Sequence, residues 1–251
     1  MTLDISPTFT WNETVWNPSM LGPALWLDAA DASTITLNGS TVSQWSDKSG
    51  NANHVFQATP SKQPTPMTGE IDFDGIDDML TAASPVLTGS YSGQLTLFSV
   101  SRLQSDSGYL YGSVDTDGTA LYQQSSKIDL ANTLTGATAN QKLHGIASGS
   151  RGLVGTVYNN QSVIYSFNGT AVNADFAYTF AAPSTNFTLG NRFNGTASAT
   201  YWDGAHSEVI VLNRALTSTE RHKLEGYLAH KWGLDASLPA DHPYKNYGPR
   251  P

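Results

Sequence analysis

The stretch from Ser207 to Leu234 constrains the fold most, because it reads as one strand followed by one capped helix. The apolar run Glu208–Leu212 is rich in β-branched residues and predicts a buried strand. Thr217, followed three residues later by Glu220, forms a capping box and predicts that a helix begins there. Gly233 is suited to the left-handed conformation that ends a helix. Upstream the chain reads as short strands and turns, so we expect a single helix packed on a β structure.

The rest of the chain alternates short strands with turn residues. Asn38-Gly39 and Asn168-Gly169 are typical of tight turns between antiparallel strands. Gln94–Leu103 is apolar on both faces, which predicts a central strand covered on each side. The pattern predicts an all-β fold, a two-sheet antiparallel sandwich with one C-terminal α-helix. Residues 1–22 are broken by prolines and predict an N-terminal arm, and residues 23–251 predict one domain.

Composition narrows the classes of function. The chain has no cysteine, which excludes disulfides, zinc–thiolate sites and thiol catalysis. Its net charge of −8 argues against a nucleic-acid partner. No apolar run approaches the roughly 20 residues of a membrane-spanning helix, and the start lacks the features of a Sec signal peptide. We therefore expect no membrane insertion and an extracellular location, reached either as a mature fragment or by another route such as release by cell lysis.

Several short motifs resemble the laminin-G-like jelly roll of the concanavalin A-like lectin/glucanase superfamily. They lie between about residue 24 and 245 and are Leu25-Trp-Leu-Asp-Ala29, Trp45-Ser-Asp-Lys-Ser-Gly-Asn51, Phe73-Asp-Gly-Ile-Asp-Asp78, Phe167-Asn-Gly-Thr170 and the Glu208–Leu234 block. The resemblance implies a concanavalin A-like jelly-roll sandwich, but this superfamily includes lectins, adhesion modules, glucanases and structural domains. As a stand-alone domain with an HKWGL-type ending, the chain also resembles proteins of marine bacteria and their phages.

A glycosidase site is one interpretation of the residues around Glu70. Glu70, Asp72 and Asp74 alternate on one face and resemble the Glu-x-Asp-x-Glu strand of glucanases, in which two carboxylates act as nucleophile and acid/base. Asp74 stands where the acid/base glutamate belongs and is one methylene shorter. The jelly-roll motif explains the same residues, with Phe73 in the core and a turn at Asp74-Gly75. We therefore expect no catalytic residues and predict that the chain is not an enzyme.

Two loops carry oxygen ligands of the kind that calcium prefers. One contains Asp47, Asn51 and Asn53, and the other contains Asp74 with the Asp77-Asp78 pair. The resemblance implies a structural calcium near such loops. The same residues also form Asx-turns without any ion, so both interpretations stay open. No cofactor is required by the sequence.

Loop aromatics with polar neighbours indicate a glycan-binding site. Aromatic faces stack on sugar C–H groups, while amides and charged groups bind hydroxyls. Trp202 is the central candidate, although its position also fits a buried residue at the end of a strand. The predicted glycan-binding residues are Trp202, Tyr201, Asp203, Arg192, Asn194 and Tyr158.

The N-terminal arm carries three large aromatic residues, Phe9, Trp11 and Trp16. Exposed apolar area of this kind either packs back on the sandwich or anchors the chain to a partner. We expect a non-enzymatic surface protein of a phage particle, a capsid decoration or tail-associated protein. Its arm would contact other virion proteins, and its lectin-like loops would bind a host or environmental polysaccharide. The alternatives are a glycan-binding module of a secreted bacterial protein and, third, a glucanase.

Overall fold

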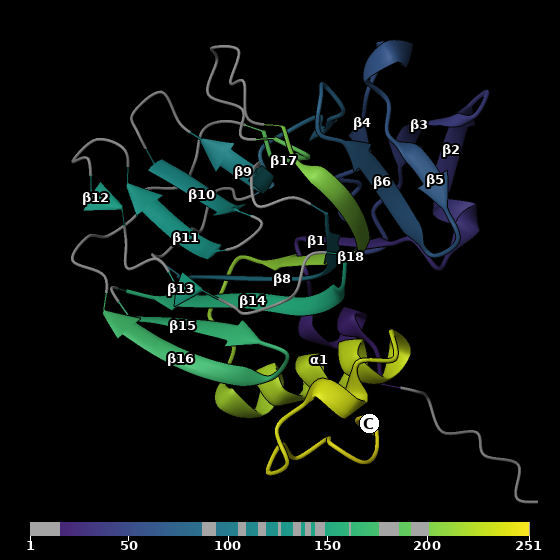
Figure 1. Ribbon diagram of the computed structural model, residues 1–251. Coiled ribbons are helices and arrows are strands. Elements are labelled where there is room, and N and C mark those ends of the chain that lie inside the picture. The colour runs from purple at the N-terminus through teal and green to yellow at the C-terminus, as the bar shows by residue number, and fades with distance from the viewer. Residues whose placement is uncertain are drawn as a thin grey trace, which may run out of the picture.

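The structure is a computed structural model that describes residues 16–86, 94–104, 109–114, 119–124, 127–132, 137–138, 142–143, 149–160, 162–175, 186–191 and 201–250. Two antiparallel sheets lie face to face, and helix α1 (Ser218–Lys231) covers the outer face of one of them (Figure 1). It is the one α-helix in the part of the chain described. The predicted all-β, two-sheet sandwich with a C-terminal helix is therefore confirmed.

The first sheet is the one against which α1 packs. Its strands are β1 (Leu25–Asp28), β5 (Thr65–Met67), β6 (Glu70–Asp74), β8 (Gln94–Leu103), β14 (Arg151–Asn159), β15 (Ser162–Phe167), β16 (Thr170–Asp175) and β18 (Asp203–Leu212). They are arranged in the order β16-β15-β14-β8-β18-β6-β5, and β1 also pairs with β18. The central position of β8, between β14 and β18, confirms the prediction from its two apolar faces.

The second sheet closes the other side of the core. Its strands are β2 (Ile35–Asn38), β3 (Thr41–Trp45), β4 (Val55–Phe56), β7 (Leu80–Ala82), β9 (Tyr109–Val114), β10 (Thr119–Gln124), β11 (Lys127–Asn132), β12 (Ala137–Thr138), β13 (Lys142–Leu143) and β17 (Thr188–Leu189). Their order is β12-β11-β10-β9-β17-β7-β4-β3-β2, with β13 paired to β11. Short 3₁₀ helices lie at Pro18–Leu21, Ala32–Thr34, Pro60–Lys62 and Asp235–Ser237.

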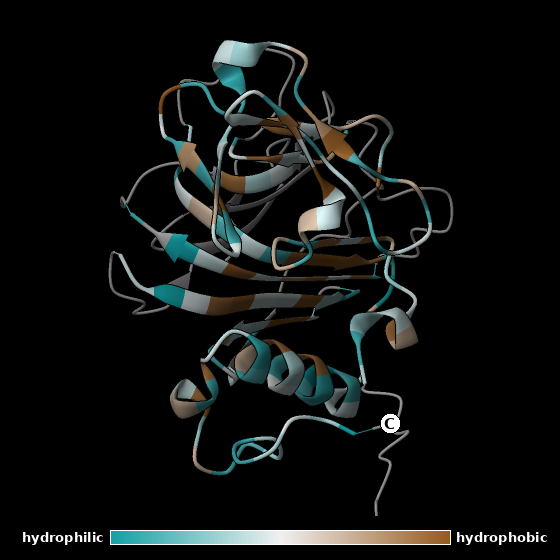
Figure 2. Ribbon diagram, turned by 90° about the vertical axis from the view of Figure 1, so that its right-hand side faces the viewer, coloured by the Kyte–Doolittle hydropathy of each residue, from teal (hydrophilic) through white to brown (hydrophobic). Residues whose placement is uncertain are grey.

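The buried apolar residues form two clusters, one on each face of the first sheet. Strand β8 contributes side chains to both. Leu95 and Leu97 belong to the cluster between the sheets, whereas Phe98 and Val100 belong to the cluster under α1. Figure 2 shows brown, apolar residues along strands of both sheets, and α1 lying beneath the sheet that it covers. Burial of this area supplies most of the favourable free energy of folding.

Helix α1 begins and ends where the sequence predicts. The Thr217 hydroxyl accepts from the Glu220 N–H at 3.3 Å, and the Glu220 carboxylate accepts from the Thr217 N–H at 2.9 Å. Gly233 has φ of 70°, and the Leu234 N–H donates to the Ala229 carbonyl at 2.7 Å. The capping box is therefore confirmed.

Trp16 is part of the domain's own core. It is 3% exposed, and its ring lies edge-on to Tyr227 of α1 with centroids 5.7 Å apart. Leu21 is buried in the same cluster. The prediction that Trp16 anchors a partner is therefore wrong, because the helix-side cluster already covers its ring. Phe9 and Trp11 lie outside the described residues.

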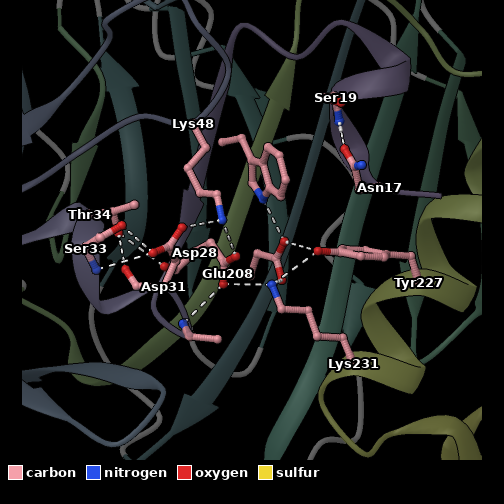
Figure 3. A network of polar contacts seen from close by, with 12 residues as sticks. Asn17, Ser19, Asp28, Asp31, Ser33, Thr34, Lys48, Glu208, Tyr227 and Lys231 are labelled. Atoms are coloured by element: carbon pink, nitrogen blue, oxygen red, sulfur yellow. Dashed lines mark hydrogen bonds and ion pairs between the residues drawn. The ribbon is translucent and has the colours of Figure 1, made fainter. Parts of the chain in front are cut away.

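A buried carboxylate, Glu208, joins α1 to the sheet (Figure 3). The indole N–H of Trp26 donates to its Oε1 at 2.7 Å, and the indole N–H of Trp232 donates to its Oε2 at 2.6 Å. The Lys231 ammonium lies 2.8 Å from Glu208 Oε2 and 2.7 Å from Asp28 Oδ1. Burial raises the pKa of Glu208, and the Lys231 charge opposes that rise. One side chain of β18 is thus bonded to β1 and to the last turn of α1.

The same network continues to the loop after β3. Lys48 Nζ lies 2.9 Å from Asp28 Oδ2 and 2.8 Å from Asp31 Oδ2. Its ammonium also lies 4.8 Å from the centroid of the Trp26 ring. The Lys48–Asp31 contact is one reason that the pKa of Asp31 is lowered to about 2. Two lysines therefore neutralise the carboxylates that gather at β1.

We expect Glu208→Gln to lower the free energy of unfolding by about 3 kcal/mol or more, because it leaves the buried Asp28 and the half-buried Lys231 with an incomplete network. Urea denaturation followed by tryptophan fluorescence measures this change. Glu220→Gln is the matched control, since Glu220 pairs with Arg214 at 2.8 Å on the surface. It should cost about 1 kcal/mol or less. Equal losses in both variants would contradict the structural role of Glu208.

Candidate functional site

Two hollows lie where the C-terminal segment crosses α1. The first, here called the tyrosine hollow, has a volume of about 430 Å³ and is lined by Lys223, Pro243, Tyr244, Tyr247, Gly248 and Arg250. The second, the histidine hollow, has a volume of about 390 Å³ and includes Arg221, His222, Asp241 and His242 in its lining. Pro243 lines both, so the two hollows adjoin.

The tyrosine hollow presents an aromatic ring to solvent. Tyr247 is 75% exposed, more than any other aromatic side chain whose exposure the structure describes. Tyr244 beside it is half-buried. Lys223 comes from α1 and Arg250 from the end of the described chain, and no carboxylate among the described residues lines the hollow. Aromatic rings next to cations form a surface suited to a sugar that carries negative charge.

The segment that carries both tyrosines is fixed in place. Lys245 Nζ donates to three backbone carbonyls, those of Asp235 at 3.0 Å, Ala236 at 2.8 Å and Leu238 at 2.7 Å. His230 Nε2 lies 2.8 Å from the Tyr244 carbonyl. Gly226 of α1 allows the close approach, because a Cβ there would lie 2.4 Å from Tyr244 Cβ. A ligand would therefore meet an ordered surface and lose little affinity to ordering it.

The histidine hollow is built on a second buried carboxylate, Glu225. It accepts from Arg221 Nη1 at 2.6 Å and from Ser166 Oγ, and it lies 3.1 Å from His242 Nε2. Arg221 Nη2 lies 2.7 Å from His222 Nε2, and burial together with the Arg221 charge lowers the pKa of His222. Glu225 neutralises Arg221, so this cluster ties β15 and the C-terminal segment to α1. Ser166 bonds to the carboxylate and not to a histidine, so it is not set up as a nucleophile.

A serine and a histidine do meet elsewhere, inside the sandwich. Ser101 Oγ lies 2.9 Å from His206 Nδ1, and His206 Nε2 lies 3.0 Å from the Leu110 carbonyl. Burial lowers the pKa of His206 to about 4, which keeps the ring neutral. Both side chains have no exposed surface, so no substrate reaches them. The pair is a structural contact between strands.

The glucanase-like carboxylates lie on the outer face of the first sheet, paired with arginines. Glu70 accepts from Arg102 Nε at 2.9 Å and from Arg151 Nε at 3.0 Å, and Asp72 lies 2.9 Å from Arg102 Nη2. Asp74 is exposed and accepts from the Ile76 N–H at 2.8 Å, as expected for the turn that follows β6. Glu70 and Asp72 therefore share a face, while Asp74 serves the turn.

The first calcium loop is held together by its own aspartate. Asp47 Oδ1 accepts from the Trp26 N–H at 2.9 Å and the Ser49 N–H at 2.8 Å. Its Oδ2 accepts from Ser49 Oγ at 2.6 Å and the Asn53 N–H at 3.0 Å. The side-chain amide of Asn51 donates to the Pro23 carbonyl at 2.9 Å. Both oxygens of the Asp47 carboxylate therefore accept hydrogen bonds from the chain itself, which agrees with the Asx-turn interpretation.

In the second calcium loop, Asp74, Asp77 and Asp78 each offer a carboxylate oxygen, and these atoms lie within 4.8 Å of one another. Asp78 is buried, and desolvation raises its pKa to about 6, with neighbouring carboxylates adding to the rise. The folded state therefore favours protonated Asp78, and stability falls as the pH rises from about 4 to 6. Calcium at this loop stays a prediction.

If calcium binds at this loop, it should raise the melting temperature of the protein at neutral pH, because the ion would neutralise these carboxylates. Thermal denaturation with calcium and with EDTA measures the shift. Asp78→Asn should remove it and should be more stable than the wild type in EDTA, since a buried charge is lost. Asp241→Asn, an exposed aspartate elsewhere, is the control and should keep the shift. No calcium-dependent shift in the wild type would rule the ion out.

The predicted glycan-binding residues do not form one site. Trp202 and Tyr158 have no exposed surface and belong to the cluster between the sheets. Their assignment to a glycan surface is therefore wrong, because both rings point into the sandwich. Tyr201 and Asp203 are half-buried at the start of β18. Arg192 and Asn194 lie outside the residues that the structure describes.

Sequence reasoning missed the tyrosine hollow. The signal was present in the C-terminal run Tyr244-Lys-Asn-Tyr247-Gly-Pro-Arg250, in which two tyrosines stand among polar residues with no apolar neighbour to bury them. Such tyrosines are expected at a surface.

No family model matches the chain, and no curated protein matches it in sequence. Its fold is similar to that of Trypanosoma rangeli sialidase in complex with sialic acid, with a TM-score of 0.59, 15% identity, 82% of this chain covered and 33% of that chain. A second structure of that sialidase, in complex with 2,3-difluoro-KDN, gives a TM-score of 0.59, 14% identity, and coverage of 84% and 33%. A mutant of the same sialidase displaying trans-sialidase activity gives a TM-score of 0.57 and 14% identity, with 80% of this chain and 32% of that chain covered. The chain spans about a third of the length of these sialidases.

This likeness supports the all-β sandwich and corrects one prediction. The similar structures are enzymes, which contradicts the prediction that the chain is not an enzyme, and that prediction is withdrawn. At this identity the likeness shows the fold alone, so it assigns no catalytic residue. No helix in the described ranges is long and apolar enough to span a membrane.

Proposed function

We propose that the chain is a glycan-binding domain of the laminin-G-like jelly-roll type that holds acidic sugars in the tyrosine hollow. The observation that carries the proposal is the Tyr247 ring, 75% exposed on a segment that Lys245 and His230 fix in place. A rigid aromatic ring offers apolar contact area at low entropic cost, which is how proteins stack on sugar faces.

The charge of the hollow supports an acidic sugar. Lys223 and Arg250 line it, and neither forms an ion pair with any described residue. Arginine in particular matches the planar carboxylate with two parallel hydrogen bonds. The sialidases of similar fold include one in complex with sialic acid, which is a carboxylated sugar.

We further propose that the domain presents this hollow on an outer surface. The setting suggested by the sequence is a phage particle, as a capsid decoration or tail-associated protein, and the alternative is a secreted bacterial protein. Mass spectrometry of purified virions tests the setting, because a virion protein must be found there in stoichiometric amount.

Binding to 3′-sialyllactose, measured by isothermal titration calorimetry, tests the proposed site. Tyr247→Ala should weaken binding by about tenfold or more, because loss of a stacked ring costs about 1.4 kcal/mol. Phe56→Ala is the matched control, since Phe56 is an aromatic side chain of the second sheet that is 41% exposed. It should bind like the wild type. Unchanged binding by Tyr247→Ala would contradict the proposal.

The double variant Lys223→Gln, Arg250→Gln tests whether these two cations hold the carboxylate, with lactose as the uncharged comparison ligand. The wild type should prefer sialyllactose, and the preference should fall as salt screens the charges. The double variant should bind both ligands alike. A double variant that keeps the preference would show that other residues hold the carboxylate.

A further inference from the structure

An amine, a carboxyl group and a second, buried carboxylate meet where the end of α1 reaches the first sheet (Figure 3). Lys231 Nζ lies 2.7 Å from Asp28 Oδ1 and 2.8 Å from Glu208 Oε2. Asp28 and Glu208 are direct partners in the register of β1 and β18, so their side chains share one face of the sheet. One lysine nitrogen is therefore held beside a carboxyl group and next to a second group that can take up and return a proton.

These three groups are largely removed from bulk water. The side chains of Glu208, Asp28 and Lys231 are 0%, 6% and 21% exposed. The Lys231 ammonium lies 5.4 Å from the centroid of the Tyr227 ring and 5.0 Å from that of the Trp232 ring, so aromatic side chains border it. Exclusion of water favours the condensation of an amine with a carboxyl group, because water is the product that must leave.

The Asp28 carboxyl group is held by donors on both of its oxygens. The Ala30 N–H donates to Oδ1 at 3.1 Å, and Lys48 Nζ lies 2.9 Å from Oδ2. Lys48 is thus placed where negative charge develops when a nucleophile adds to the carboxyl carbon. Groups held in contact in this way react far faster than the same groups free in solution.

We infer that Lys231 and Asp28 join in an isopeptide bond that forms within the folded chain, with Glu208 as the proton-transfer group. Lys231 Nζ forms a bond with Asp28 Cγ, and the bond between Cγ and Oδ1 breaks. Glu208 takes two protons from Nζ, one after the other, and passes them to Oδ1, which leaves as water. An ammonium and a carboxylate become one neutral amide, so atoms and charge balance without an oxidant, a reductant or a co-substrate.

Glu208 is the carboxylate suited to this role. Burial raises its pKa, which favours uptake of a proton, although the Lys231 charge opposes that rise. Lys48 also contacts Asp28, but its other carboxylate partner, Asp31, is 35% exposed. The hydrogen bond from Lys48 helps to lower the pKa of Asp31 to about 2, which makes Asp31 a poor proton acceptor. The reacting amine is therefore Lys231.

The bond would join β1 covalently to the last turn of α1. The chain has no cysteine, so a disulfide cannot supply such a link. The inference does not depend on the proposed function, because Lys231, Asp28 and Glu208 do not line the tyrosine hollow.

Intact-mass spectrometry of the denatured full chain tests the inference. The wild type should be lighter than its sequence requires by the mass of one water molecule. A succinimide at an aspartyl-glycine pair, such as Asp74-Gly75 or Asp203-Gly204, gives the same loss, so tryptic peptides must also be sequenced. The isopeptide bond predicts a branched peptide that joins Asp28 to Lys231, with no cleavage after Lys231.

Three variants separate the roles of the residues, and tryptophan fluorescence checks that each is folded. Lys231→Arg keeps the charge but removes the nucleophile, so its mass should equal that of its sequence. Glu208→Gln cannot take up a proton, so its linked fraction should rise about a hundredfold more slowly. Lys62→Arg, in the 3₁₀ helix Pro60–Lys62, is the matched control and should lose one water like the wild type.

A folded wild type that keeps the full mass of its sequence would overturn the inference. So would a branched peptide that contains Lys48 in place of Lys231, or a water loss located at an aspartyl-glycine pair. If Lys231→Arg or Glu208→Gln does not fold, the peptide map of the wild type decides alone, because the branch identifies both residues directly.

Discussion

The buried carboxylate of Glu208 fixes the position of helix α1 on the first sheet. Two indole N–H groups and one ammonium converge on it, from β1 and from the end of α1. A charge buried in this way is costly unless every partner is in place, so the network defines one position of the helix on the sheet. Trp26 and Trp232 serve at once as apolar surface and as donors, which joins the packing to the polar network.

The fixed helix in turn positions the candidate binding surface. Gly226, Glu225 and His230 lie on α1 and hold the C-terminal segment by close packing, by the contact with His242 and by a hydrogen bond to the Tyr244 carbonyl. The tyrosine hollow is thus a product of helix docking and not of the sheets themselves. These contacts hold the segment that carries Tyr244 and Tyr247, which lowers the entropic cost of ordering it when a ligand binds.

Local patterns in the sequence predicted local structure well. The capping box at Thr217 and the central strand Gln94–Leu103 were predicted from spacing and burial alone, because each is set by residues close in the chain. The burial of Trp202 and Trp16 was not predicted, because it depends on contacts with residues from distant strands and from α1. The tyrosine hollow was missed for the same reason: Tyr247 gains its neighbour Lys223 only when the tail crosses the helix.

A crystal structure of the protein in complex with 3′-sialyllactose would show directly whether the tyrosine hollow binds an acidic sugar. We expect the sugar between α1 and the C-terminal segment, with its ring against Tyr247 and its carboxylate at Lys223 and Arg250. A sugar bound on the second sheet, or at the half-buried Tyr201 and Asp203, would contradict it.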